Sequence, residues 1–249
     1  MIDVSVTIIS KNEAQNIREC LRSVEWASEI VVVDQFSEDE TVEIAQQFGA
    51  KVFREPWHGF ARQKNFAIDK AIGPWILSLD ADERVTPALK QEIKDNLSQE
   101  NEYSGYCIAR KNFFCGQWIR HGGWYPDYNL RLFRKSQGHF EDRAVHEKII
   151  VSGKVGYLEH PLEHFTYRSI PDFLLRLESY SRLAAQELPA KTRWSISYSL
   201  CLRPLFTFIN MYLLRGGLLD GTPGFFLAVS YAYYTFLKYY RSCEDHFDH

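Results

Sequence analysis

Apolar and polar positions along the first hundred residues follow two alternating patterns. Short runs that are almost entirely apolar, as in buried parallel strands, alternate with longer segments that repeat apolar residues at helical spacing. The predicted strands are 4–9, 30–33, 51–54 and 75–79. The predicted helices are 13–24, 38–48, 60–72 and 87–97. This order predicts an α/β fold, in which helices flank a mostly parallel sheet with right-handed crossovers.

The pattern changes near residue 103, where strands and loops replace the strand–helix alternation. The predicted strands here are 105–110, 129–133 and 155–158. The loop 115–128 is crowded with glycine and aromatic residues, and structured loops of this length are often functional. An amphipathic helix is predicted over 171–188.

Two segments near the C-terminus, 200–214 and 224–237, are strongly apolar and aromatic. Each is shorter than the about 20 residues that a membrane-crossing helix needs. The stretch 191–241 contains six basic residues and one acidic residue, Asp220, and aromatic and basic side chains suit a membrane interface. We therefore predict a C-terminal helical appendage that lies on an anionic membrane surface. The alternative is a helical hairpin packed on the rest of the chain or on a second subunit.

Composition narrows the class of partners. The chain has 249 residues and a formal net charge of -3, so it lacks the basic excess of a general nucleic-acid binder. Five cysteines are scattered without a CxxC pair, which indicates neither a zinc site nor a disulfide framework. No signal peptide precedes the first predicted strand. These features predict a protein of the reducing cytoplasm.

The sharpest chemical signal is the pair Asp80 and Asp82 at the end of the apolar run 75–79. Alternation along a strand sends both carboxylates to the same side, where their charges repel. A hard divalent cation, Mg²⁺ or Mn²⁺, relieves this repulsion, because it prefers carboxylate oxygens and keeps positions open for substrate phosphates. The carboxyl end of a strand is also where open α/β sheets bind ligands. The alternative is a solvated acidic turn.

Further polar side chains follow the other predicted strands. The first strand is followed by Ser10-Lys11-Asn12-Glu13 and the second by Asp34. Loops at one edge of a sheet converge, so these segments could bind a nucleotide, with Asp34 accepting from a uracil or a ribose. Caps for the next helices are the alternative. Arg62, Lys64 and the N-terminus of their helix could meet phosphate, or form a solvated basic face.

Together these segments resemble the family 2 glycosyltransferases, since four family elements occur in family order and spacing. The elements are Val6-Thr7-Ile8-Ile9-Ser10-Lys11-Asn12-Glu13, then Val31-Val32-Val33-Asp34 with Ser37-Glu38-Asp39-Glu40-Thr41, then Lys64-Asn65, and then Asp80-Ala81-Asp82. The resemblance implies a GT-A, Rossmann-like fold, an inverting transfer from a UDP-sugar donor and a divalent cation. Gln35-Phe36 departs from the family, which often has a small or polar pair there, so the shape of the nucleoside pocket stays open.

The resemblance also assigns roles to single residues. It implies nucleotide-sugar binding by Ser10, Asn12, Glu13, Asp34, Lys64, Asn65, Asp80, Asp82 and His146. The metal would be held by Asp82, helped by Asp80.

The acceptor half of the chain should supply a carboxylate that takes the proton of the acceptor hydroxyl. The segment 140–147 resembles the Val-His-Glu segment of some bacterial members, so we predict Glu147 as the base and Asp142 as the reserve. His146 could ligate the metal or contact the diphosphate, or be structural. Glu147 could instead pair with Arg131 or Lys148 on a surface strand.

Aromatic side chains in the loop 115–128 could stack on a sugar, although plain hydrophobic cover for the sheet would look the same. They are Trp118, Trp124 and Tyr125, together with His121. His160 and His164 lie four residues apart, but Pro161 argues against the helix that a metal pair at this spacing would need.

The segment 215–225 resembles a C-terminal signature of bacterial lipopolysaccharide core glucosyltransferases. This likeness implies glucose from UDP-glucose as the donor sugar and a lipid-linked inner-core saccharide as the acceptor, at the inner face of a bacterial inner membrane. We predict a catalytic domain over 1–168, with a nucleotide-sugar half 1–100 and an acceptor half 101–168, followed by a helical region 169–249.

Two other readings compete with this interpretation. A sugar nucleotidyltransferase shares the sheet and an aspartate-bound metal, but normally has a glycine-rich phosphate loop after its first strand, where this chain has Ser10-Lys11-Asn12-Glu13. A non-catalytic membrane-associated scaffold on the same fold would not need the intact acidic pair. The sequence leaves the oligomeric state open.

Overall fold

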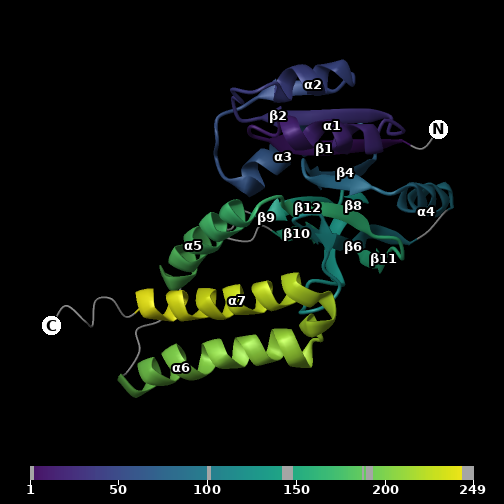
Figure 1. The fold of residues 1–249 in the computed structure, drawn as a ribbon. Coiled ribbons are helices and arrows are strands. Elements are labelled where there is room, and N and C mark those ends of the chain that lie inside the picture. Colours follow the sequence, from purple (N-terminus) through teal and green to yellow (C-terminus); the bar gives the residue numbers. More distant parts are fainter. Residues whose placement is uncertain (1–2, 100–101, 142–147, 187, 189–192, 243–249) are drawn as a thin grey trace. The chain divides into compact units, whose positions relative to one another are not determined.

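The computed structural model describes residues 3–99, 102–141, 148–186, 188 and 193–242 (Figure 1). By its internal contacts the chain forms two compact units. Unit 1 comprises Met1–Arg110 and Asp127–His164, and unit 2 comprises Lys111–Pro126 and Phe165–His249. The sequence divides the chain by expected function, into a catalytic domain 1–168 and a helical region 169–249, and this division stays a prediction.

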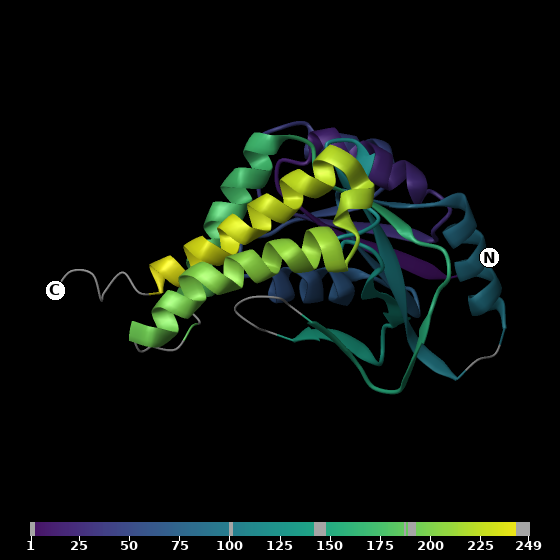
Figure 2. The ribbon, with the colours of Figure 1, turned by 60° about the horizontal axis from the view of Figure 1, so that its bottom comes forward.

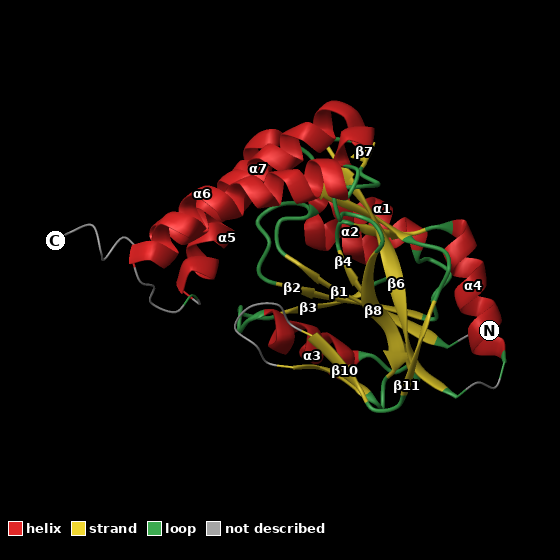
Figure 3. Ribbon diagram, turned by 90° about the horizontal axis from the view of Figure 1, so that it is seen from below, coloured by secondary structure: helices red, strands yellow, loops and turns green. Residues whose placement is uncertain are grey.

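The first half of unit 1 confirms the predicted strand–helix alternation. Its elements are β1 (Val4–Ser10), α1 (Ala14–Ser23), β2 (Glu29–Asp34), α2 (Thr41–Gln47), β3 (Lys51–Arg54), α3 (Phe60–Lys70), β4 (Trp75–Asp80), β5 (Glu83–Val85) and α4 (Pro87–Ser98). The strands β3, β2, β1 and β4 are neighbours in that order, and all three of their pairings are parallel (Figure 3). The predicted α/β fold with a mostly parallel sheet is therefore confirmed in this half of unit 1.

The second half of the sheet is antiparallel at its core. Its strands are β6 (Tyr103–Phe114), β8 (Asp127–Arg134), β11 (Lys154–Tyr157) and β12 (Leu162–Tyr167), and β9 (Gly138–Glu141) pairs with β10 (Lys148–Val151) in a separate hairpin. The strand β8 pairs antiparallel with both β4 and β6. The strand β12 pairs antiparallel with the short β5. The sequence did not predict β5, β9, β10 or β12, because each is short and lacks a long apolar run.

Strand alternation divides the core of unit 1 between the two faces of the sheet. One cluster joins Val32 and its neighbours to α1, α2 and α4, and the other joins Val31 and Val33 to α3 and the β9–β10 hairpin. Because both faces are covered, the central strands β1, β2 and β4 are buried on both sides, as is usual for parallel strands.

The parallel register aligns the polar ends of the strands. Ser10, the last residue of β1, pairs with Asp34, the last residue of β2, and Ile9 pairs with Asp80 at the end of β4. Three predicted site residues therefore emerge at one edge of the sheet, as expected for the carboxyl ends of parallel strands.

The second helix begins later than predicted, at Thr41 instead of 38. The polar segment before it makes tertiary hydrogen bonds: Asp39 accepts from the backbone N–H groups of Thr41 and Ala14, and Asn12 Oδ1 accepts from the N–H of Glu38. Side chains that bind backbone groups across two loops hold this segment out of a helix.

Unit 2 contains the loop with β7 (Gln117–Trp118) and three long helices, α5 (Ile170–Gln186), α6 (Arg193–Ile209) and α7 (Gly221–Arg241). A π-helical turn, Asn210–Leu214, and a 3-10 turn, Gly217–Asp220, connect α6 to α7. The helices α6 and α7 lie side by side as a hairpin (Figure 2). Among the described residues, no helix is long and apolar enough to cross a membrane.

Candidate donor and metal site

The carboxylate of Asp34 is built into the end of β2 by three hydrogen bonds. It accepts from the backbone N–H of Ser37 at 2.8 Å, from Ser37 Oγ at 2.5 Å and from Ser10 Oγ at 3.1 Å. The residue is fully buried. These surroundings suit a carboxylate that shapes the turn, and its contact with a uracil or a ribose stays a prediction.

The loop after β1 is tied to the loop after β2 through Ser37. Asn12 has a left-handed backbone with φ 54°, and its N–H donates to Ser37 Oγ at 2.8 Å. The N–H of Glu13 donates to Thr41 Oγ1 at 2.8 Å. The structure thus brings Ser10, Asn12 and Asp34 together, and Ser37 is the link that the sequence did not identify as a site residue.

Asp80 is partly exposed and contacts a network of buried charges. Its Oδ1 is 3.0 Å from Lys64 Nζ, and its Oδ2 is 2.7 Å from Arg131 Nη2. The same Arg131 nitrogen is 2.5 Å from Oε1 of the fully buried Glu83. Glu83 Oε2 accepts from the backbone N–H of Asp80 at 3.0 Å, which closes the network.

The network fixes the charge state of Asp80. Burial by itself would raise the pKa of this carboxyl, but the charges of Arg131 and Lys64 outweigh it and hold the pKa well below its ordinary value. Burial would lower the pKa of Arg131, but Asp80 and Glu83 raise it above its ordinary value. Asp80 is therefore ionised at neutral pH, and protein cations balance its charge. The repulsion that the sequence suggested at the acidic pair is relieved at Asp80 by Lys64 and Arg131.

Asp82 has different surroundings. Its Oδ2 lies 3.4 Å from Nε2 of His164; Asp82 is partly exposed and His164 is buried. The antiparallel pairing of β5 with β12, with Glu83 opposite His164, brings these distant segments together. The sequence considered His164 only as part of a helical metal pair with His160, and its contact with Asp82 was not foreseen, because the strand that carries it was not predicted.

The residues at Asp82 fit a divalent cation better than those at Asp80. No group of three or more metal-ligating side chains occurs in the described ranges. Asp82 and His164 nevertheless offer one carboxylate and one imidazole at contact distance, whereas Asp80 is engaged by two cations. Magnesium-type ions often take only one or two protein ligands and complete their shell with water and substrate phosphates. Asp82 with His164 could hold such an ion in that way.

Asn65 has a structural partner in unit 1. Its amide donates to the carbonyl of Phe140 at 2.8 Å and accepts from the N–H of Phe140 at 2.8 Å. Asn65 therefore fastens β9 to α3, and any contact with the donor stays a prediction. Asp142, His146 and Glu147 lie outside the described residues. Arg131, one alternative partner of Glu147, is engaged by Asp80 and Glu83.

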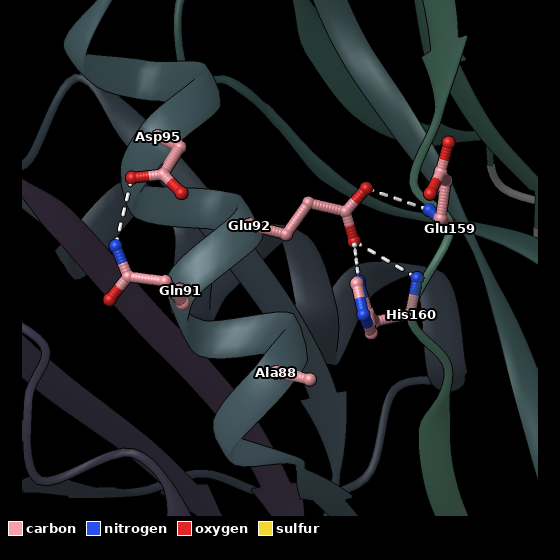
Figure 4. Close-up of a pocket in the computed structure, with 6 residues that line it drawn as sticks. All are labelled: Ala88, Gln91, Glu92, Asp95, Glu159 and His160. Atoms are coloured by element: carbon pink, nitrogen blue, oxygen red, sulfur yellow. Dashed lines mark hydrogen bonds and ion pairs between the residues drawn. The ribbon is translucent and has the colours of Figure 1, made fainter.

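A surface pocket beside α4 is lined by none of the predicted nucleotide-sugar or metal residues (Figure 4). Glu92 accepts there from the backbone N–H groups of Glu159 and His160 and lies 3.0 Å from His160 Nδ1. These bonds fasten the segment before β12 to α4. His160 and His164 thus have separate carboxylate partners and share no helix, as Pro161 predicted.

In unit 2, Trp124 differs from the other predicted sugar-stacking residues. It is buried in an aromatic cluster with Phe114 and Tyr231, so it is core, as the alternative stated. Trp118 packs edge-on against Tyr125 with ring centroids 5.5 Å apart. His121 Nδ1 lies 3.0 Å from Asp220 Oδ1.

With the fold and the strand-end site in place, comparison with known proteins defines the class. The model of the glycosyl transferase family 2 matches residues 5–152, and the chain belongs to this family. It is 31% identical to the lipopolysaccharide core biosynthesis glycosyltransferase LpsC of Rhizobium meliloti, over 98% of this chain and 93% of that protein. It is 29% identical to an uncharacterized glycosyltransferase of Rickettsia felis, over 96% of this chain and 88% of that protein.

Solved structures agree with the fold. The mannosyltransferase PcManGT of Pyrobaculum calidifontis, in complex with GDP-Man and Mn²⁺, has a TM-score of 0.57 at 14% identity, over 97% of this chain and 87% of that one. S. aureus TarS 1-349 in complex with UDP has a TM-score of 0.51 at 15% identity, over 99% of this chain and 91% of that one. The fold is GT-A, and the chain is a glycosyltransferase. The nucleotidyltransferase and scaffold interpretations are therefore set aside.

Proposed function

We propose that this glycosyltransferase moves a hexose, glucose from UDP-glucose, onto a lipid-linked saccharide of the lipopolysaccharide inner core, with inversion and with a divalent cation. The likeness to LpsC over nearly the whole of both chains supports the acceptor class. The observation that carries the proposal is the strand-end site. Asp34 and Asp80 end the parallel strands β2 and β4 on either side of β1, Asp82 follows β4, and the buried cations Lys64 and Arg131 contact Asp80.

The donor would lie along this edge of the sheet. Asp34, with the loop Ser10–Glu13, would receive the nucleoside, and Lys64 would face the diphosphate. Lys64 and Arg131 are both buried and are held in place by Asp80. Fixed cations at a leaving diphosphate stabilise its developing charge without reorganising during the reaction.

The metal would be held by Asp82 and His164. When bound, a divalent cation neutralises charge on the departing diphosphate. The imidazole and carboxylate are already 3.4 Å apart, so binding would replace their mutual contact. Asp80 would support the site indirectly, through Lys64 and Arg131.

Glu147 is proposed as the base, with Asp142 as the reserve, and His146 as a contact to the diphosphate. A carboxylate in this role removes the acceptor hydroxyl proton as the oxygen attacks the anomeric carbon. Glu147→Gln should keep its affinity for UDP and lose transfer activity, measured as the glucose transferred from UDP-glucose to the acceptor. Full activity of this variant would move the base to Asp142.

The C-terminal hairpin is proposed to lie on the inner face of the inner membrane. Four leucines around the turn are 45% to 70% exposed: Leu213, Leu214, Leu218 and Leu219. Over residues 199–242 the only acidic residue, Asp220, is buried, while Arg203 and Arg215 are exposed. An apolar surface with basic residues fits an anionic bilayer surface.

Calorimetry of UDP binding, with and without Mn²⁺, tests the donor site. We expect binding by the wild type to require Mn²⁺ and to fail in Asp82→Asn and His164→Gln. Asp95→Asn, which removes an exposed carboxylate from α4, is the matched control and should bind as the wild type does. Metal-independent binding, or normal binding by Asp82→Asn, would refute the proposed metal site.

A further inference from the structure

Two cations are arranged on a single indole ring in unit 2. Lys111 Nζ lies 4.4 Å from the ring centroid of Trp118, and the guanidinium carbon of Arg120 lies 4.3 Å from the same ring. Contacts of this kind attract a cation to an aromatic face and restrict where it lies. The Trp118 ring therefore holds two cations near it, and it packs edge-to-face with Tyr125.

A third cation, Arg215, lies against the same loop. A Cβ at Gly123 would overlap its guanidinium, so this side chain lies directly on the Gly123 backbone. Gly123 has a positive φ of 88°, which an L side chain rarely adopts. The N–H of Gly122 donates to the carbonyl of Arg215 at 2.9 Å, which fixes the loop and Arg215 relative to each other.

Asp220 anchors the part of the loop that carries Arg120. Its carboxylate is buried and accepts from the backbone N–H of Arg120 at 3.2 Å and of His121 at 2.8 Å, and contacts His121 Nδ1 at 3.0 Å. One buried carboxylate thus orders the backbone that presents Arg120. A site ordered before binding loses less entropy when its ligand arrives.

We define the basic platform as Lys111 and Arg120, which lie on the Trp118 ring, and Arg215, which lies on the Gly123 backbone of the same loop. In the described part of the chain, neither Arg120 nor Arg215 has a carboxylate within ion-pair distance. The carboxylate of Asp220 contacts the His121 side chain and the backbone N–H groups of Arg120 and His121 instead. Like charges held on one ordered surface repel unless an anion binds between them. Arginine forks match the geometry of phosphate and carboxylate groups.

We propose that the basic platform binds a saccharide that carries a phosphate or a carboxylate group, with Tyr125 and Trp118 beside its ring. This saccharide would be the acceptor, an assignment that rests on the proposed function. The inference names an anionic acceptor, which neither the family nor the donor site requires.

Saturation-transfer NMR on the full chain tests the proposal, with mannose 6-phosphate, glucuronate and neutral mannose as probes. UDP and Mg²⁺ are kept saturating, so that a sugar phosphate does not occupy the donor site. We expect saturable binding of an anionic probe and none of mannose. Arg120→Gln with Arg215→Gln should weaken that binding by about tenfold or more, since two charge-assisted contacts are lost.

Two variants control for structure and charge. Arg182→Gln removes an exposed arginine from α5 and should leave binding unchanged. Arg120→Lys keeps the charge and should retain most of the affinity. Equal binding of mannose and the anionic probes, no binding of either anionic probe, or normal binding by the double variant would each overturn the proposal.

Vesicles of phosphatidylglycerol distinguish a lipid headgroup from a sugar anion. If the double variant loses vesicle binding but keeps its affinity for mannose 6-phosphate, the platform is a membrane contact and the proposal is wrong. UDP affinity, measured on the same samples, separates this test from the donor site. A wild type that fails to bind UDP refutes the proposed function, while an arginine-dependent affinity for mannose 6-phosphate would still support the platform.

Discussion

The strand-end network of unit 1 and the basic platform of unit 2 differ in how their charges are paired. Around Asp80, protein cations and carboxylates pair with one another: Lys64 and Arg131 contact Asp80, and Arg131 and Arg110 lie at ion-pair distance from Glu83. In the platform, Arg120 and Arg215 have no carboxylate of the described chain at ion-pair distance. The carboxylates of the first arrangement are paired within the protein, and the two arginines of the second are not.

This difference separates structure from recognition. Buried charges must be paired, because the loss of one partner leaves an uncompensated charge in a medium of low dielectric constant. Exposed charges need no partner for folding, so an ordered set of one sign is better explained by binding. In the proposed function, the network around Asp80 would serve the reaction by holding Lys64 in place, and the platform would serve it by attracting an anion.

The largest effect is expected from breaking the network at its centre. Arg131→Met removes the charge but keeps much of the volume, and leaves Asp80 and Glu83 without their shared partner. The free energy of unfolding should fall by about 3–5 kcal/mol in urea titrations. Arg182→Met, on an exposed helical pair, should change it by less than about 0.5 kcal/mol. Similar stabilities of the two variants would show that the network is not structural.

The next effect concerns the exposed turn of the hairpin. Leu214→Ser and Leu219→Ser remove two leucines that are 70% and 68% exposed. If each is buried in the bilayer interface, each substitution should weaken binding to phosphatidylglycerol vesicles by about tenfold or more. Leu175→Ser, on α5 and 67% exposed, is the matched control for a leucine outside the hairpin. Equal losses at all three positions, in a flotation assay, would argue against insertion of the turn.

A pH titration of stability isolates Asp80. Its pKa in the folded state is held below the ordinary value by Arg131 and Lys64, although burial opposes them. Such a carboxylate contributes stability above its unfolded-state pKa, and the contribution is lost as pH falls through the folded-state pKa. Unfolding free energy should therefore decline below about pH 4 in the wild type. The decline should be smaller in Asp80→Asn, and an unchanged slope would contradict the assigned charge state.

Sequence patterns predicted the parallel half of the fold well, for a physical reason. The strands β1, β2 and β4 are buried on both faces, and the runs 30–33 in β2 and 75–79 in β4 are almost entirely apolar, so they are visible without tertiary information. Their ends then located Ser10, Asp34 and Asp80 at one edge of the sheet. Short strands that depend on their partners, such as β5 and β12, gave no such signal.

Strand pairings that the sequence did not predict bring these side chains together. His164 meets Asp82 because β12, which was not predicted, pairs with β5, and Arg131 reaches Asp80 because the predicted strand β8 pairs with β4. No local spacing relates these residues. Asp80 and Asp82 look equivalent in sequence, and only the tertiary contacts assign one to protein cations and the other to an imidazole.

The smallest predicted effect distinguishes the two regions most directly. Arg120→Gln with Arg215→Gln should leave the free energy of unfolding within about 0.5 kcal/mol of the wild type, because exposed charges without a carboxylate partner contribute little to folding. The same double variant should lose affinity for the anionic probe. Arg131→Met should lose stability instead, so thermal melts and probe titrations on both variants form a crossed test. Marked destabilisation by the double variant would mean that Arg120 and Arg215 hold the fold, and the platform would then be structural like the network around Asp80.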